Sequence, residues 1–253
     1  MPKKKAKHPK HPRTAPSSAK MVAPPAAELE GIEFDARRAE RLETAAYLKA
    51  SRTPLAVIDI AEHATALAET TIQKVMELHP PPPLACKVGC DWCCYLTVGT
   101  SVPEVARIVD YLRKTQSPEQ LNALLERIIK LQERRRQMRV NECEKEPLPC
   151  ALLVDHRCSV YPVRPLTCRG CNSTDPEPCE EFLWSRGISI PMYVPQHRLT
   201  TFVLDGMRAG LLESGLKGDR LELTAALRIV LEVPNAVECW LAGEPVFASA
   251  RLS

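Results

Sequence analysis

Apolar residues recur at helical spacing in two long segments near the start of the chain. The Ala-, Glu- and Arg-rich segment 28–49 predicts a helix whose apolar positions are Ile32, Phe34, Leu42, Ala45, Ala46 and Leu48. A second helix is predicted over 55–79, because Pro54 fits a first helical turn and the four prolines at 80–83 cannot continue a helix. These prolines predict a stiff linker into the residues that follow.

Two capping signatures predict the next pair of helices. Ser101 and Glu104 have capping-box spacing and open a helix to about residue 115, and Ser117 and Gln120 repeat the signature before a longer helix. The apolar stripe of that longer helix is Leu121, Leu124, Leu125, Ile128, Ile129 and Leu131. Further helices are predicted over 196–215, 219–233 and 236–242.

The composition changes between residues 143 and 195, where prolines, cysteines, glycines and short apolar runs replace the helical pattern. Its most regular piece, 150–161, predicts a small hairpin around the polar turn 155–157. The sequence therefore predicts a mainly α fold: a helical bundle-like domain with an irregular Cys-rich insert that contains a small β-hairpin. Its parts are a disordered basic tail (1–27), N-terminal helices with a Pro-rich linker (28–85), a cysteine-cluster core (86–195) and C-terminal helices that pack on that core (196–253).

Charge is uneven along the chain. Residues 1–27 hold seven Lys or Arg and no acid, whereas the whole chain has a formal net charge of only +3, so the remainder is mildly acidic. We expect nucleic acid to bind, if at all, only through this tail. The basic start runs into Pro, Ser and Thr instead of an apolar signal region, and charged residues interrupt the longest apolar stretch, 55–68. A cytoplasmic protein without a membrane span is predicted.

Eleven cysteines are the unusual feature of the composition. In a reducing compartment such a number favours metal or redox chemistry over a disulfide framework. Four of them lie within nine residues, and on a helix their side chains would share an arc of about 100°. Five more lie between residues 150 and 179, and thiolates are preferred ligands of zinc and of iron–sulfur clusters. The predicted metal ligands are Cys86, Cys90, Cys93, Cys94, Cys150, Cys158, Cys168 and Cys171.

Other residues are assigned by their context. Arg164 and Arg169 stand among the second group of cysteines, where guanidinium groups would offset the charge of about −2 of a four-thiolate site and donate hydrogen bonds to sulfur. Cys143 and Cys239 lie in helical, unclustered contexts and are predicted to be buried thiols. His156 lies in the hairpin turn and is predicted to be exposed. Spacing alone leaves open zinc or iron, one site or two, and whether Cys179 is a ligand.

The motif Cys86-Lys-Val-Gly-Cys-Asp-Trp-Cys-Cys94, followed by Glu104, Cys150 and Cys158-Ser-Val-Tyr-Pro-Val-Arg-Pro-Leu-Thr-Cys-Arg169, resembles the YkgJ-like cysteine-cluster family. That family is described as a proposed zinc- or iron-chelating domain with a CxxCxxCC pattern. The resemblance covers about 86–179. It implies that Cys86, Cys90, Cys93, Cys94, Cys150, Cys158 and Cys168 are the family cysteines, with Glu104 and Arg164 as accompanying positions and with Cys171 and Cys179 as additions. Some relatives fuse this domain to flagellin lysine N-methylases with an iron–sulfur cluster.

Three other functions compete with a non-catalytic metal module. The first is an iron–sulfur redox or protein-methylation accessory, and the second is a nucleic-acid-binding zinc protein that uses the tail. The third is a radical S-adenosylmethionine enzyme, since Cys86, Cys90 and Cys93 also fit that spacing, although the chain lacks the strand–helix succession of a partial barrel. No Gly-rich phosphate loop, nucleophile elbow or metalloprotease motif is evident, so no catalytic activity is readable from the sequence. The sequence leaves open whether the chain binds a protein partner.

Overall fold

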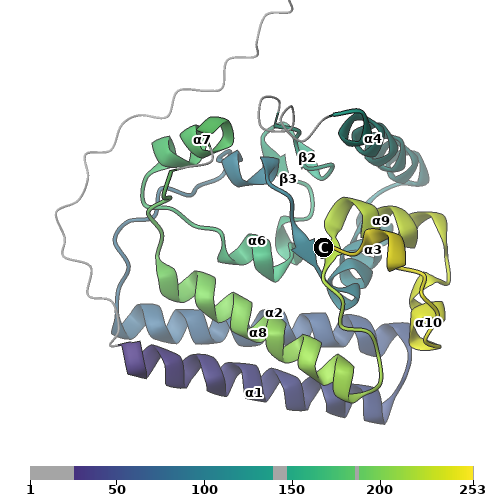
Figure 1. Cartoon of the computed structure of the whole chain (residues 1–253), viewed down its shortest axis with the longest axis horizontal. Coiled ribbons are helices and arrows are strands. Elements are labelled where there is room, and N and C mark those ends of the chain that lie inside the picture. Colours follow the sequence, from purple (N-terminus) through teal and green to yellow (C-terminus); the bar gives the residue numbers. More distant parts are fainter. Residues whose placement is uncertain (1–25, 139–146, 186–187, 253) are drawn as a thin grey trace, which may run out of the picture.

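The computed structural model describes residues 26–138, 147–185 and 188–252. Nearly all of its regular structure is helical, which confirms the mainly α fold (Figure 1). The α-helices of these residues are α1 (Ala26–Ala50), α2 (Pro54–Leu78), α3 (Val102–Thr115), α4 (Pro118–Gln137), α6 (Leu166–Gly170), α7 (Pro176–Ser185), α8 (Val194–Glu213), α9 (Leu223–Glu232) and α10 (Ala236–Leu241). The strands are β1 (Gly99–Thr100), β2 (Leu153–Val154), β3 (Arg157–Cys158) and β4 (Leu221–Glu222).

The starts of α2, α3 and α4 follow the predicted capping chemistry. Thr53 accepts a hydrogen bond from the backbone of α2, whose first residue is a proline. Both capping boxes are present: Ser101 with Glu104 begins α3, and Ser117 with Gln120 begins α4. Each box satisfies backbone N–H groups that have no partner within the helix, which explains why local sequence predicted these helix starts closely.

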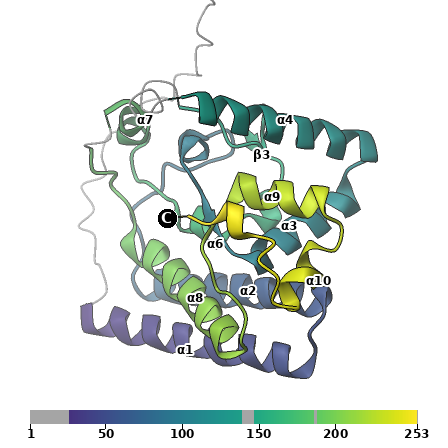
Figure 2. The same cartoon turned by 45° about the vertical axis from the view of Figure 1, so that its right-hand side comes forward.

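Helices α1, α2 and α8 lie side by side as one layer along the base of the molecule (Figures 1 and 2). Two glycines on α8 let α1 approach closely. A Cβ added to Gly206 would collide with the carbonyl oxygen of Arg37, and one added to Gly210 would lie 2.6 Å from that of Arg41. Glycine is therefore needed at both positions, where two helix backbones meet.

Helices α3, α4 and α9 pack above this layer, and α10 adjoins α9 (Figure 2). A continuous hydrophobic core extends from Ala36 on α1 to Ala250 near the end of the chain. The C-terminal helices therefore pack on the N-terminal helices as well as on the middle of the chain. Helix α1 begins at Ala26, so the predicted tail 1–27 overlaps it by two residues and otherwise lies outside the described residues.

The segment 219–222 differs from its predicted helical structure. Leu221 and Glu222 pair antiparallel with Thr100 and Gly99, so α9 begins only at Leu223. The Glu222 side chain accepts a hydrogen bond from Ala225 N at 2.7 Å and caps the helix. A strand pair between residues more than 100 positions apart has no local signal.

The predicted hairpin is present as the antiparallel pair β2–β3. Asp155 and His156 form its turn with φ values of 48° and 60°, in the left-handed region. Helices α6 and α7, within the predicted irregular insert, were not foreseen. No helix of the described residues has both the length and the apolar character that a membrane span needs.

Candidate metal centre

The first cysteine segment, residues 86–94, is a turn followed by the beginning of a short 3-10 helix. Gly89 has φ +89°, and the N–H of Cys90 donates to the carbonyl of Lys87 at 2.9 Å, so the chain reverses between Cys86 and Cys90. This turn brings the two thiols into a mutual hydrogen bond. Residues Trp92–Tyr95 then form the 3-10 helix η1. The four cysteines therefore do not share one face of an α-helix, and a turn gathers them instead.

Cys93 and Cys94 on η1 connect this segment to the rest of the insert. The thiol of Cys93 hydrogen-bonds to those of Cys94 and Cys171. The carbonyl oxygen of Cys94 accepts a hydrogen bond from the N–H of Cys150 at 2.7 Å. Two cysteine groups that lie more than 50 positions apart in the sequence are thus adjacent in the structure.

The hairpin and α6 bring in Cys150, Cys158 and Cys168. Leu153 N donates to Cys150 O at 3.0 Å, and Leu153 is paired with Cys158 across β2–β3. All three cysteines pack against the hydrophobic core. These three predicted ligands are therefore partly buried and are held in place by their packing against the core.

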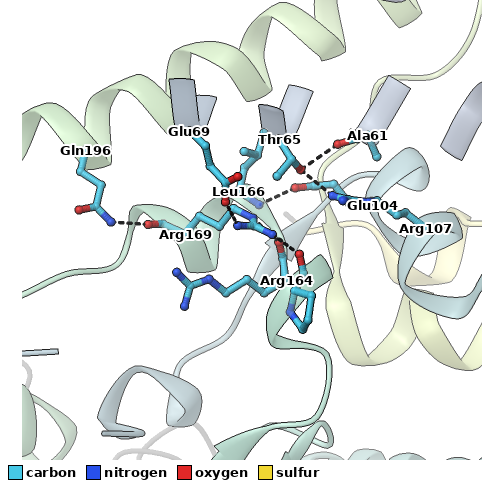
Figure 3. Close-up of polar contacts among 10 residues, drawn as sticks. Ala61, Thr65, Glu69, Glu104, Arg107, Arg164, Leu166, Arg169 and Gln196 are labelled. Atoms are coloured by element: carbon cyan, nitrogen blue, oxygen red, sulfur yellow. Dashed lines mark hydrogen bonds and ion pairs between the residues drawn. The ribbon is translucent and has the colours of Figure 1, made fainter. Parts of the chain in front are cut away.

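A buried carboxylate holds the beginning of α6. Glu104 Oε1 accepts a hydrogen bond from Leu166 N at 2.7 Å (Figure 3). Its Oε2 accepts from Ser101 N at 2.9 Å and from the Thr100 hydroxyl at 3.2 Å. Burial raises the pKa of Glu104. The sequence predicted Glu104 as a capping residue, and the resemblance gave it as a position that accompanies the family cysteines. The structure shows that Glu104 also joins α3 to the helix that contains Cys168.

The segment 171–185 closes the other side of the cluster. Ala85 N donates to Ser173 O at 2.8 Å, and the Cys86 thiol lies 4.0 Å from the same oxygen. Helix α7, which contains Cys179, packs on η1. Cys179 therefore lies beside the first cysteine segment, although sequence spacing left its position open.

One cysteine of the described residues lies away from the cluster. Cys239 is on α10, in the other half of the molecule, and is partly exposed, so the prediction of a buried thiol is wrong there (Figure 1). Cys143 lies outside the described residues. The remaining nine cysteines gather from three segments of the chain, and each is a free thiol.

The two predicted arginines differ in their surroundings (Figure 3). The Arg164 guanidinium lies 4.0 Å from the centre of the Tyr161 ring and acts electrostatically on Cys93 and Cys158. Its Nε is buried and has no hydrogen-bond partner among the described residues. Arg164 therefore lies within electrostatic range of two of the thiols, and the predicted hydrogen bond from its guanidinium to sulfur is not formed among the described residues.

Arg169 is buried and hydrogen-bonds elsewhere. Its side chain donates to Glu69 on α2 and to the carbonyl oxygens of Arg164 and Pro162 (Figure 3). Its own carbonyl accepts from Gln196 on α8 at 2.7 Å. Among the described residues none of these hydrogen bonds goes to sulfur, so Arg169 anchors α6 to the helical layer.

One polar pair has no counterpart among the sequence-based expectations. His156 in the hairpin turn is about half exposed, as predicted, and its Nδ1 lies 2.8 Å from Oδ2 of the buried Asp91. Asp91 precedes η1, so this pair fastens the hairpin turn to the first cysteine segment. No local pattern could have linked two residues 65 positions apart.

The thiols differ in acidity according to their surroundings. Hydrogen bonds with Cys171 and then Cys94 lower the pKa of Cys93 to about 3, and Arg164 acts in the same direction. A hydrogen bond with Cys90 lowers the pKa of Cys86 to about 7. Burial raises the pKa of Cys150 to about 11. Hydrogen bonds with Cys86 and Cys93 raise the pKa of their partners Cys90 and Cys171. The anionic thiolate, the form that binds metals, is thus favoured at Cys86 and Cys93.

The donor set has the chemistry of a soft-metal site, because thiolates bind zinc and iron–sulfur clusters and an arginine is present to balance their charge. Within the described residues, no three His, Cys, Asp or Glu side chains are already arranged to hold a metal ion. The thiols instead hydrogen-bond to one another: Cys86 with Cys90, and Cys93 with Cys171 and Cys94.

Comparisons with protein-family models, with curated proteins and with solved structures returned no match to this chain.

Proposed function

We propose that this chain is a cytoplasmic metal-binding protein whose clustered cysteine thiolates hold zinc or an iron–sulfur cluster. The hydrogen bond from Cys150 N to Cys94 O is the observation that most supports the proposal, because it joins the two predicted ligand segments. The resemblance to the YkgJ-like family points to the same chemistry. Free thiols throughout the cluster suit a reducing compartment.

The surroundings also suit a negatively charged metal centre. Four thiolates around zinc(II), or around a dicationic four-iron cluster, give a net charge of about −2. The Arg164 guanidinium acts on two of the thiols and has a buried Nε that lacks a partner among the described residues. A thiolate ligand would satisfy that N–H by a charge-assisted hydrogen bond.

The fold argues against a radical S-adenosylmethionine enzyme. Such enzymes need parallel strands that alternate with helices, whereas the strand pairs of the described residues are two short antiparallel ones. A redox or methylation accessory would use the same cysteines, so metal analysis separates it from a zinc module.

The test is anaerobic purification of the whole chain followed by analysis of zinc, iron and acid-labile sulfide. Stoichiometric zinc in a colourless protein, or iron with matching sulfide in a brown one, is the expected result. The variant Cys94→Ser should lower the metal content, while Cys239→Ser on α10 should leave it unchanged. Protein that contains neither metal, and that takes up neither on reconstitution, would refute the proposal.

A further inference from the structure

The residues just before Cys168, 162–166, form a connecting segment that leads from the 3-10 turn η2 (Tyr161–Val163) into α6. Two of them, Pro162 and Pro165, have no N–H group to donate, so a continuous series of backbone hydrogen bonds is not available to the segment. Side chains must supply the missing restraint. Whatever restrains the connecting segment also determines where Cys168 lies.

Two buried side chains of opposite charge bind the backbone of the connecting segment. Glu104 is 5% exposed and accepts a hydrogen bond from Leu166 N. Arg169 is 8% exposed and donates to two carbonyl oxygens, from Nε to that of Arg164 at 3.1 Å and from Nη2 to that of Pro162 (Figure 3). Hydrogen bonds with a charged partner are stronger than neutral ones, so both side chains restrain the segment.

The Arg169 guanidinium makes two kinds of contact. Its Nε and Nη2 bind carbonyl oxygens of the connecting segment, whereas Nη1 binds the Glu69 carboxylate on α2. The Glu69 side chain is 58% exposed, so water competes for that contact. The planar guanidinium directs several hydrogen bonds at once, whereas the ammonium of lysine is a point charge on a flexible stem. The contact with α2 and the contacts with the carbonyls can therefore be separated by substitution.

The contacts with the carbonyls reach the cysteine cluster in two ways. Cys168 directly precedes Arg169 on α6, and Arg169 N donates to Pro165 O at 3.0 Å. The carbonyl of Arg164 is one of the two that Arg169 binds, so the Arg164 guanidinium, 4.0 Å from the centre of the Tyr161 ring, extends from a restrained backbone. Without these contacts, both the thiol and this guanidinium would be free to shift.

We propose that Arg169 is a positioning residue of the metal site, which fixes the Cys168 ligand through the carbonyl oxygens of Pro162 and Arg164. This inference rests on the proposed function and deepens it, because it names the residue that holds one ligand in place before the metal binds. Arg169 itself does not touch the metal, since its side chain is directed at the backbone and at Glu69.

Alkylation of Cys168 in the reduced, metal-free whole chain measures this restraint. Arg169→Lys keeps the charge but cannot make both carbonyl contacts, so Cys168 should react about tenfold faster than in wild type, while the Cys150 rate should not change. Arg107→Lys is the matched control, because Arg107 binds Thr65 on the same helix α2 at 2.8 Å. None of its hydrogen bonds within the described residues goes to the connecting segment, so the Cys168 rate should stay within about twofold of wild type.

The substitution Glu69→Gln separates the two kinds of contact. It weakens the contact with α2 and leaves both carbonyl contacts in place, so Cys168 should react at close to the wild-type rate. If Glu69→Gln speeds the reaction as much as Arg169→Lys does, Arg169 serves only to anchor α6 to the helical layer, and the proposal is overturned. A Cys168 rate in Arg169→Lys equal to that of wild type would overturn it as well.

The bound metal gives a readout that a merely structural role would not change. Cobalt(II) serves as the probe in place of zinc, because its thiolate ligands give a charge-transfer absorption that falls when a thiolate is lost. Arg169→Lys should show less of this absorption per bound cobalt than Arg107→Lys, even when both variants are compared at urea concentrations where they are fully folded. Identical spectra would overturn the proposal.

Hydrogen exchange of the wild-type chain does not depend on how variants fold. The amides of Val163 and Arg169, which donate to Val160 O and Pro165 O, should be protected already in the metal-free protein. Protection that appears only with zinc would show that the metal orders the connecting segment, which would overturn the inference and leave the proposed function standing. A chain that binds no zinc, no cobalt and no iron would refute the proposed function itself.

Discussion

The substitution Glu104→Gln tests how the helical scaffold supports the cluster. The Glu104 carboxylate accepts hydrogen bonds from two backbone N–H groups, Leu166 N at 2.7 Å on one oxygen and Ser101 N at 2.9 Å on the other. Gln has one oxygen and one NH2 group. Whichever way the amide turns, one backbone N–H loses its acceptor and faces another donor.

The size of the effect follows from that lost acceptor. Glu104 is 5% exposed, so water does not readily replace the missing oxygen. A buried donor left unsatisfied costs about 1–3 kcal/mol, and we expect Glu104→Gln to lower the free energy of unfolding by about 2 kcal/mol. The substitution Glu119→Gln in the exposed first turn of α4 is a matched control and should change that free energy by less than about 0.5 kcal/mol.

Urea unfolding of metal-free, reduced protein, followed by circular dichroism, measures both variants. Alkylation of Cys168 supplies a local readout, because a loosened Leu166 N–H should free the start of α6 and speed the reaction of that thiol. Burial raises the pKa of Glu104 and so favours its neutral form, which has the same charge as the amide of Gln. If Glu104→Gln is as stable as Glu119→Gln, the two backbone N–H groups do not both depend on the carboxylate, and the reasoning is refuted.

Three further predictions use the same unfolding or alkylation assays. Gly206→Ala should destabilise the fold by about 1–2 kcal/mol, because its Cβ collides with the Arg37 carbonyl and overpacking exceeds the gain in helix propensity. Gly31→Ala on α1, where a Cβ meets no atom within 4 Å, should stabilise it by up to about 1 kcal/mol; equal effects would contradict the close approach of the helices. Burial raises the pKa of Glu40 from the ordinary value of 4.5 to about 7. Below pH 4.5 the side chain is neutral in both the folded and the unfolded chain, and the stabilising effect of the raised pKa is fully present. As the pH rises from 4.5 to 7 the unfolded chain loses its proton first, so the free energy of unfolding falls by about 3 kcal/mol. Glu40→Gln should remove that pH dependence from urea midpoints, and an unchanged profile would contradict the assignment. Hydrogen bonds lower the pKa of Cys93 to about 3, so iodoacetamide should modify Cys93 in metal-free protein at pH 5, where Cys239 stays unmodified; equal modification would contradict it.

Local chemistry made most helix starts predictable. The Ser101 and Ser117 capping boxes and the proline at the start of α2 act within one turn of the chain, so they can be read without knowledge of the fold. The predicted start of α9 was wrong because Leu221 pairs with Thr100, and strand pairing between distant residues leaves no periodic signal. Helix α6 is five residues long, too short for a hydrophobic stripe to develop.

The candidate site was predictable in its membership more than in its geometry. Cysteine density indicated which residues would gather, and the Cys150 to Cys94 hydrogen bond places the two groups together. Which thiol faces which depends on distant contacts such as Asp91 with His156, and on the support that Glu104 gives to Leu166. Arg169 was assigned to the site because it lies next to Cys168 in sequence, but its side chain turns to Glu69 on α2.

X-ray absorption at the edge of the bound metal tests the central claim most directly, because it reports the ligand atoms themselves. The whole chain, purified anaerobically or reconstituted with zinc, should give a first shell made of sulfur alone at about 2.3 Å. Substitution of Cys239 by Ser should leave that shell unchanged. A first shell dominated by nitrogen or oxygen would contradict the assignment of the metal to the cysteine cluster.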